Sequence, residues 1–255
     1  MTKFANTQQT LQREIRQFPE LRHAYLKAIS EARGGRTVVS FFMSFDTRTP
    51  LMPEDADQIE EILCNSKIEK GITLLLDAPG GDGLTAERII RICKSYSKGD
   101  FETIVPARAK SAATMVCLGS DRILMSSTSE LGPVDPQVLV DLTGKGVHQW
   151  VAAHYITKTF DALFTEAKEL RDGQIEPFLQ QLSKFNAVQI EQLRAATALA
   201  ENIVVGALEK GMLQGRSKGE IKALIKPFTD PDQTMSHGRG IGAEQAKSAG
   251  STSRS

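Results

Sequence analysis

Two stretches decide the fold: LLLDAPGGDGLTAERII at Leu74–Ile90 and IVPARAKSAATMVCLGSDRILM at Ile104–Met125. Each begins as an apolar strand, passes through a turn of small residues and ends in the start of a helix. The first turn contains Gly80 and Gly81, where no Cβ shields the backbone N–H groups. In the second stretch, Ser111 falls where the strand ends and an Ala-rich helix begins. Placed side by side, the two turns would offer a nucleophile and an oxyanion hole.

Both turns also have a purely structural interpretation. A serine at a helix start is most often an N-cap, although Ser111 would also lie at the positive end of the helix dipole. Ala112 and Ala113 are small enough to leave room for an acyl group above its hydroxyl. Gly80 and Gly81 could simply satisfy a strand-to-helix turn that needs positive φ, and the two roles are compatible.

The first part of the chain alternates strands and helices. The β-branched and aromatic run Thr37–Phe45 predicts a buried strand, and Pro53 opens an acidic helix. Further strands are expected at 72–77, 102–106 and 122–125, with helices at 84–95 and 111–118. This alternation implies right-handed βαβ units on a mainly parallel sheet.

The second part has a helical pattern. Helices are expected at Val147–Leu170, Pro177–Leu182 and Asn186–Leu208. Ser217 is predicted to cap a further helix, with Glu220 completing a capping box. The final GSTSRS segment is expected to be disordered.

Composition excludes several classes of protein. The chain has 255 residues with 31 basic and 31 acidic side chains. Its net charge is therefore zero, and no overall positive field favours binding to nucleic acid. The sequence contains no run of 18 apolar residues, so no transmembrane segment is predicted. The N-terminal residues lack the apolar region of a secretory signal. Cys64, Cys93 and Cys117 form no CxxC pair, which argues against a metal site and favours buried, reduced thiols in a cytoplasmic protein.

Three motifs in order carry a resemblance to a known family: DAPGG at 77–81, KSA at 110–112 and SELGPVDPQ at 129–137. Their order and spacing resemble the Clp/crotonase superfamily of serine peptidases. Within it, the chain is most similar to the serine dehydrogenase proteinase family, a soluble relative of signal peptide peptidase A. The resemblance is strong from about Val38 to Val138 and weaker in the N-terminal helices and at TMSHGRGIGAEQAKSAG, residues 234–250.

The resemblance implies an α/β protein with a Clp/crotonase-type repeated ββα core. We expect an N-terminal helical segment at 1–35, the α/β core at 36–146, a C-terminal helical extension at 147–249 and a disordered tail at 250–255. It also implies a homo-oligomer that hydrolyses a polypeptide substrate without metal or organic cofactor. Nothing in the sequence identifies an ATPase or adaptor partner.

The resemblance assigns the chemistry to particular residues. Ser111 would attack the substrate carbonyl, and the N–H groups of Gly80, Gly81 and Ala112 would form the oxyanion hole. Glu130, Gly132, Pro133 and Asp135 fall in a loop that borders the substrate groove in this family, although the same residues also fit a turn fixed by proline.

The general base departs from the Clp pattern. Clp-type peptidases carry a histidine about 25 residues after the serine, and this chain has Val134 and Asp135 there. Signal peptide peptidase A uses a later lysine instead, so the first choice is a Ser-Lys dyad with Lys158. Lys158 lies among apolar residues of AAHYITKTFDALF, where desolvation would lower its pKa. Lys110 adjoins the serine and is expected to diverge from it, and Lys145 lies in a Gly-flanked loop.

Two histidines remain as alternatives. His237 matches a histidine in the family's THDYPI-like segment, although Gly238 and Arg239 replace the Asp and Tyr that follow it there. It is either a base or a residue that fixes its loop. His154 lies one helical turn before Lys158 and could assist it.

Two other functions stay open at this stage. The crotonase branch acts on acyl-CoA thioesters with a similar oxyanion hole, but it needs no serine at the helix start. An inactive peptidase homologue that serves as an oligomeric scaffold or protein-binding module would explain the missing Clp histidine and the altered THDYPI-like segment.

Overall fold

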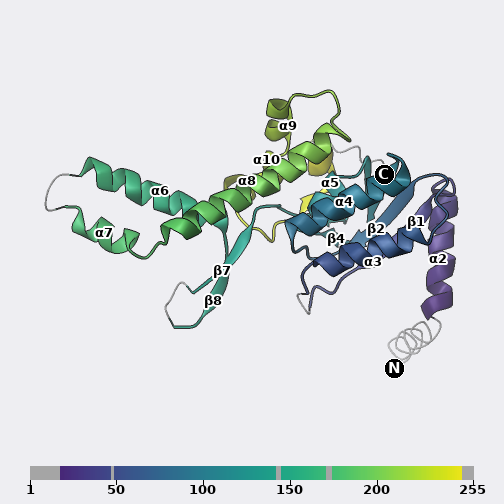
Figure 1. Ribbon diagram of the computed structural model, residues 1–255, viewed down its shortest axis with the longest axis horizontal. Coiled ribbons are helices and arrows are strands. Elements are labelled where there is room, and N and C mark those ends of the chain that lie inside the picture. Colours follow the sequence, from purple (N-terminus) through teal and green to yellow (C-terminus); the bar gives the residue numbers. More distant parts are fainter. Residues whose placement is uncertain (1–17, 47–48, 142–144, 171–173, 249–255) are drawn as a thin grey trace.

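A parallel four-stranded sheet forms the centre of the molecule (Figure 1). The computed structural model describes residues 18–46, 49–141, 145–170 and 174–248, so the expected tail at 250–255 lies outside the described residues. The strand order is β1-β2-β3-β5, and every neighbouring pair is parallel. The strands are β1 (Thr37–Phe42), β2 (Ile72–Asp77), β3 (Phe101–Val105) and β5 (Arg122–Met125). The expected α/β fold with a parallel sheet is confirmed.

The strands are connected by helices that pack over one face of the sheet (Figure 1). Pro53 opens its helix as expected, and the Asp82 carboxylate accepts hydrogen bonds from the N–H and hydroxyl of Thr85, 2.7 Å each. These caps explain why each helix starts directly after its turn. The helices are α3 (Pro53–Cys64), α4 (Gly83–Ser97) and α5 (Ala112–Leu118).

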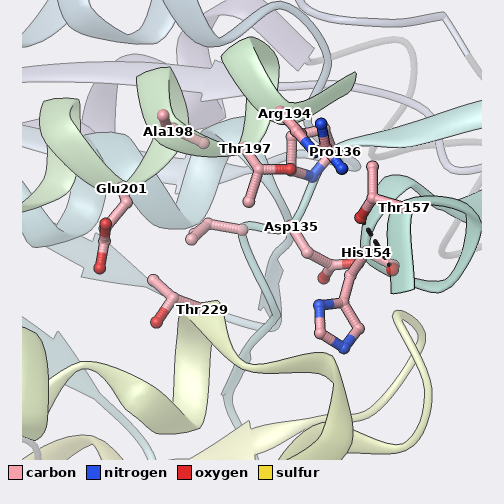
Figure 2. A pocket seen from close by; sticks show the side chains of 11 residues that line it. Asp135, Pro136, His154, Thr157, Arg194, Thr197, Ala198, Glu201 and Thr229 are labelled. Carbon is pink, nitrogen blue, oxygen red and sulfur yellow. Dashed lines mark hydrogen bonds between the residues drawn. The ribbon is translucent and has the colours of Figure 1, made fainter. Parts of the chain in front are cut away.

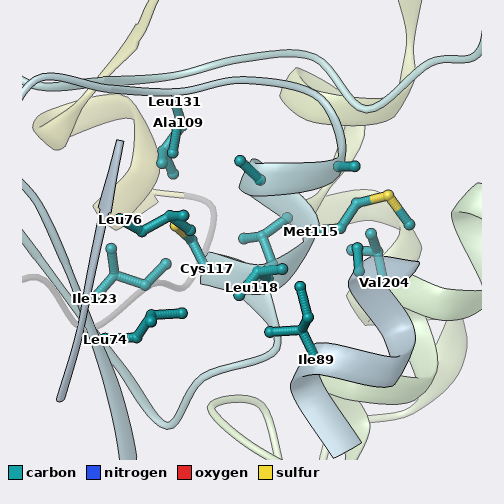
Figure 3. Close-up of a cluster of buried hydrophobic side chains, with 14 of the residues drawn as sticks. Leu74, Leu76, Ile89, Ala109, Met115, Cys117, Leu118, Ile123, Leu131 and Val204 are labelled. Atoms are coloured by element: carbon teal, nitrogen blue, oxygen red, sulfur yellow. The ribbon is translucent and has the colours of Figure 1, made fainter. Parts of the chain in front are cut away.

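The core lies between the sheet and these helices (Figure 3). Leu74 and Ile123 of the sheet face Ile89 of α4 and Leu118 of α5, and all four are almost completely buried. Val204 of α8 (Ala187–Glu209) joins the same cluster, so the C-terminal part of the chain shares this core. Apolar burial of this extent is the main stabilising term of such a fold.

A smaller sheet ties the end of the chain to its middle. Its order is β4-β6-β9, formed by β4 (Arg108–Ala109), β6 (Glu130–Leu131) and β9 (Ile241–Gly242). β4 is parallel to β6, and β9 is antiparallel to it. Through β6, this sheet links residues beyond 230 to the segment that precedes Ser111.

The region after residue 147 is not wholly helical. Residues 148–152 form β8 (His148–Ala152), which pairs with β7 (Gln137–Asp141) in an antiparallel hairpin. The expectation of a helix from Val147 is therefore wrong for its first six residues. The helix begins at Ala153, because HQWVA finds a partner strand in QVLVD, both rich in β-branched or aromatic residues.

The remaining helices follow the sequence pattern closely. α6 (Ala153–Glu169), α7 (Glu176–Leu182) and the first part of α8 extend away from the sheet as an arm (Figure 1). The predicted capping box of Ser217 and Glu220 is confirmed. The other helices are α2 (Phe18–Ala32), α9 (Lys218–Leu224), α10 (Lys226–Thr229), α11 (Pro231–Thr234) and α12 (Ala243–Ser248).

A buried carboxylate fixes the amino-terminal edge of the sheet. Glu102 is fully buried and accepts hydrogen bonds from both Arg33, at 2.9 and 2.8 Å, and Thr73, at 2.6 Å. Arg36 lies 3.3 Å from it. Burial by itself raises the pKa of the Glu102 carboxyl. The hydrogen bonds and guanidinium charges outweigh burial and lower that pKa from 4.5 to about 2.

Replacing Glu102 by Gln is expected to destabilise the protein in a pH-dependent way. A lowered pKa stabilises the fold above the unfolded-state pKa near 4.5, and this contribution disappears as the pH falls through about 2. The free energy of unfolding of Glu102→Gln is expected to fall on the order of 3 kcal/mol below wild type at pH 7, with a smaller gap at pH 3. Urea unfolding at both pH values measures this.

The control is Glu69→Gln, which breaks an exposed pair with Lys67. Its effect is expected to stay within about 0.5 kcal/mol. A gap between wild type and Glu102→Gln that does not change from pH 7 to pH 3 would contradict the assignment.

Candidate active site

A short parallel bridge between Ala78 and Ala109 holds the two turns together. The Ala78 N–H donates to the Arg108 carbonyl, and the Lys110 N–H donates to the Ala78 carbonyl, both at 3.0 Å. These bonds lie directly before the PGG turn and directly before Ser111. Because both segments follow parallel strands, the turns emerge at the same, carboxyl-terminal edge of the sheet, where ligands bind in open α/β sheets.

The glycines of the first turn are required by close backbone approach. At Gly80, where φ is +95°, a Cβ would lie 2.4 Å from the Lys110 carbonyl oxygen and 2.7 Å from the Ser111 Cβ. At Gly81, a Cβ would lie 2.2 Å from the Leu51 nitrogen. Any side chain at either position would therefore push the turn away from the serine or from the segment of Leu51.

Ser111 has a strained backbone, with φ of +50° and ψ of −120°. Such a conformation costs a non-glycine residue about 1–3 kcal/mol and is concentrated at functional sites. Ser111 occupies the N-cap position of α5, as the structural interpretation expected, but its side chain makes no capping hydrogen bond to the helix. The helix is anchored by Thr114 instead, whose hydroxyl donates to the Ala109 carbonyl at 2.6 Å.

Two backbone N–H groups near Ser111 are left unpaired by the fold. Within the described part of the chain, neither the Gly81 N–H nor the Ala112 N–H has a hydrogen-bond acceptor. A pair of unpaired, fixed donors beside a hydroxyl matches the requirement for stabilising an oxyanion.

His237 shares a groove with Ser111 and is paired with a buried carboxylate. The groove has a volume of about 500 Å³, and its walls include Gly80, Gly81, Ser111 and His237. The Nδ1 atom of His237 lies 2.9 Å from Oδ1 of Asp135, whose side chain is only 4% exposed. When Nδ1 donates its proton to Asp135, Nε2 is the ring nitrogen that remains to accept a proton.

Two contacts set the position of the loop that carries His237. β9 follows the loop and pairs with β6, in the sheet that contains the strand preceding Ser111. Glu130 of β6 lies 2.8 Å from the Lys110 ammonium, and a Cβ on Gly240 would lie 1.8 Å from the Glu130 carboxylate. Lys110 thus points toward Glu130, and Gly240 allows the loop to pass close to this ion pair.

Lys158 lies in a different environment from the one expected. Its side chain is 57% exposed and its ammonium lies 2.7 Å from the Asp232 carboxylate. This hydrogen bond raises the pKa of Lys158, so the expectation of a lowered pKa is wrong. The apolar neighbours seen in the sequence lie on other sides of α6. His154, one turn earlier, has Nε2 3.4 Å from the same carboxylate.

The loop SELGPVDPQ contributes mainly to packing around the site. The Gly132 N–H donates to the buried Thr114 hydroxyl at 2.9 Å. Among the described residues, the expected groove residues Glu130, Gly132, Pro133 and Asp135 do not line the groove, whereas Pro136 does. The pairing of Asp135 with His237 was not foreseen, because no local pattern links residues that are 102 positions apart.

A separate cavity of about 340 Å³ lies behind Asp135 (Figure 2). His154 and Thr157 of α6 line one side, and Arg194 and Glu201 of α8 line the other. Neither Ser111 nor His237 lines this cavity. We therefore assign the candidate chemistry to the groove.

Two of the three cysteines are unsuited to act as nucleophiles. Cys93 and Cys117 are buried, and burial raises the pKa of each thiol to about 12. Such thiols stay protonated at neutral pH. Cys64 is exposed rather than buried as the sequence predicted, because it lies on the outer face of α3.

In the described part of the chain, no helix combines the length and apolar character that a membrane span requires.

Comparison with known proteins places the site in a family. An uncharacterized protein of Methanocaldococcus jannaschii is 35% identical over 85 residues, covering 33% of this chain and 29% of that protein. A second one from the same organism is 27% identical over 120 residues, covering 44% of this chain and 41% of the other. The chain thus spans less than half the length of these relatives.

Among solved structures, a membrane-bound stomatin-specific protease aligns over 84% of this chain and 75% of its own, with 18% identity and a TM-score of 0.45. Residues 16–152, more than half of the chain, match the family of ClpP-like SDH-type serine proteinases. This match includes the PGG turn, Ser111 and Asp135. The chain belongs to the ClpP-like SDH-type serine proteinase family.

Proposed function

We propose that the protein hydrolyses peptide bonds through an acyl-enzyme, with Ser111 as nucleophile, His237 as general base and Asp135 as the group that orients His237. The observation that carries the proposal is that His237, which lines the same groove as Ser111, lies 2.9 Å from buried Asp135. A hydroxyl and a carboxylate-paired imidazole in one groove are the components of the serine hydrolase site, which does not depend on their order in the chain.

The proposed reaction has two halves. Ser111 Oγ attacks the peptide carbonyl carbon while His237 Nε2 takes the hydroxyl proton, and the Gly81 and Ala112 N–H groups bind the resulting oxyanion. The C–N bond then breaks, and the proton on His237 passes to the leaving amine. Water attacks the acyl-enzyme by the same route, with His237 as base, and releases the acid and Ser111.

A Ser-Lys dyad with Lys158 is the alternative that the sequence suggested. Its ammonium is paired with Asp232, and the raised pKa keeps it charged at neutral pH. A charged ammonium has no lone pair to accept a proton. His237 is therefore the proposed base, and Lys158 is proposed to tie α6 to α11 next to the His237 loop.

Replacing Ser111 by Ala is expected to abolish hydrolysis of a casein substrate and labelling by a fluorophosphonate probe. The rate is expected to fall by at least about 10³-fold, because the attacking atom is lost. Circular dichroism is expected to show an intact fold, since Ser111 makes no capping bond. Labelling of wild type with equal labelling of Ser111→Ala would contradict the assignment. An unlabelled wild type would favour the inactive scaffold.

His237→Gln and Lys158→Met separate the two candidate bases. We expect His237→Gln to lose about 10³-fold or more in kcat, since no group remains to take the serine proton. Lys158→Met is expected to keep at least about a tenth of the wild-type kcat. The kcat values are measured on equally folded and equally assembled proteins. Activity in His237→Gln with none in Lys158→Met would show that the lysine is the base.

We also propose that the protein acts as a homo-oligomer on a polypeptide substrate in the cytoplasm. The arm exposes large apolar side chains, among them Val188, which is 67% exposed. Such surfaces are commonly covered by a second subunit. Light scattering is expected to give a multiple of 27.9 kDa.

A charge at the exposed arm is expected to weaken this assembly. Val188→Glu is predicted to shift the protein toward the monomer, whereas Gln189→Glu, which adds the same charge at an exposed polar position, is not. A wild-type monomer at micromolar concentration would rule the proposal out.

A further inference from the structure

We infer that Trp150 determines specificity, by forming the wall on which a large apolar side chain of the substrate packs next to the scissile bond. The inference rests on the proposed peptidase function and adds the class of substrate. Trp150 comes from β8 of the hairpin and is 57% exposed. An exposed indole leaves a large apolar area in water, which a ligand can cover at low cost in conformational entropy.

Trp150 stands where two hollows meet. It lines the groove that contains Ser111, and it also lines a neighbouring hollow of about 490 Å³ bounded by Tyr155 and Thr234. Of the described residues, Gln137, Trp150 and His237 alone line both. An extended peptide whose carbonyl reaches Ser111 and which continues past His237 therefore passes beside Trp150.

Among the described residues, no lysine or arginine lines either hollow to pair with an acidic substrate side chain. The ionisable lining residues of the two hollows in the described chain are Asp82, Asp135, Tyr155 and His237. Asp82 caps α4, Asp135 is paired with His237, and the Tyr155 hydroxyl donates to the Pro231 carbonyl at 3.1 Å. A substrate carboxylate buried here would lose hydration without gaining an ion pair with a lysine or arginine. The lining therefore disfavours acidic side chains.

Fluorescence tests the inference without requiring catalysis, because Trp150 is the only tryptophan of the chain. The full-length Ser111→Ala protein is titrated with two end-blocked heptapeptides of alanine that carry a single central phenylalanine or glutamate. The phenylalanine peptide is expected to shift the Trp150 emission to shorter wavelength and to reduce its quenching by acrylamide. The glutamate peptide is expected to leave both unchanged.

Kinetics provide the second arm. Trp150→Ala is expected to lower kcat/KM for the phenylalanine peptide about tenfold or more, the usual size of an apolar pocket's discrimination. It is expected to leave kcat/KM for the all-alanine peptide within about threefold. Trp150→Phe retains an aromatic wall and is expected to restore the preference. Leu139→Ala is the matched control, since Leu139 faces Trp150 across the hairpin and is exposed but does not line either hollow.

Two results would overturn the inference. One is an unchanged Trp150 emission at peptide concentrations that slow fluorophosphonate labelling of the wild type. The other is a ratio of kcat/KM for the phenylalanine peptide to kcat/KM for the all-alanine peptide that is the same in wild type and in Trp150→Ala. Fluorophosphonate labelling of Trp150→Ala at the wild-type rate would show that the nucleophile is intact. Absence of labelling in the wild type would instead refute the peptidase function, while the fluorescence titration would still report on Trp150.

Discussion

The two hydrogen bonds between Ala78 and the segment Arg108–Lys110 are the constraint on which the site depends. They extend the parallel pairing beyond the ends of the main strands, so that two turns from different βα units lie against each other. The close contact of Gly80 with Lys110 and Ser111 is a consequence, and it explains the glycine. The strained φ and ψ of Ser111 are tolerated because the strand before it and helix α5 after it are both held in place.

His237, the second part of the site, comes from the C-terminal part of the chain. β9 adds to β6, and β6 adds to β4, so the small sheet links the His237 loop to the strand directly before Ser111. Asp135 follows β6 on the same chain segment and meets His237 at 2.9 Å. The Val134 N–H also donates to the Phe228 carbonyl, 2.8 Å away, which holds the Asp135 segment against α10. Thus the positions of Ser111, His237 and Asp135 depend on three strands of only two residues each.

Local sequence patterns predicted the parts of the fold that are determined locally. The PGG turn, the Ser111 junction and the capping box of Ser217 were all predicted from residues within a few positions of one another. The partner of His237 could not be found in this way, because Asp135 is distant in sequence and depends on β9 pairing. Lys158 was misjudged for the same reason: its apolar neighbours on α6 were visible, but its ion pair with Asp232 was not. Trp150 could not be singled out from sequence, because it falls in the segment from Val147 whose pattern predicts a helix and which forms β8 instead.

The central claim is that His237, oriented by Asp135, serves Ser111. It is tested most directly by a crystal structure of the assembled protein after reaction with diisopropyl fluorophosphate. We predict phosphorylated Ser111, with the phosphoryl oxygen within about 3 Å of the Gly81 and Ala112 nitrogens and His237 Nε2 within hydrogen-bond distance of Oγ. A lysine ammonium, or a side chain from a neighbouring subunit, in the position predicted for His237 Nε2 would contradict the account.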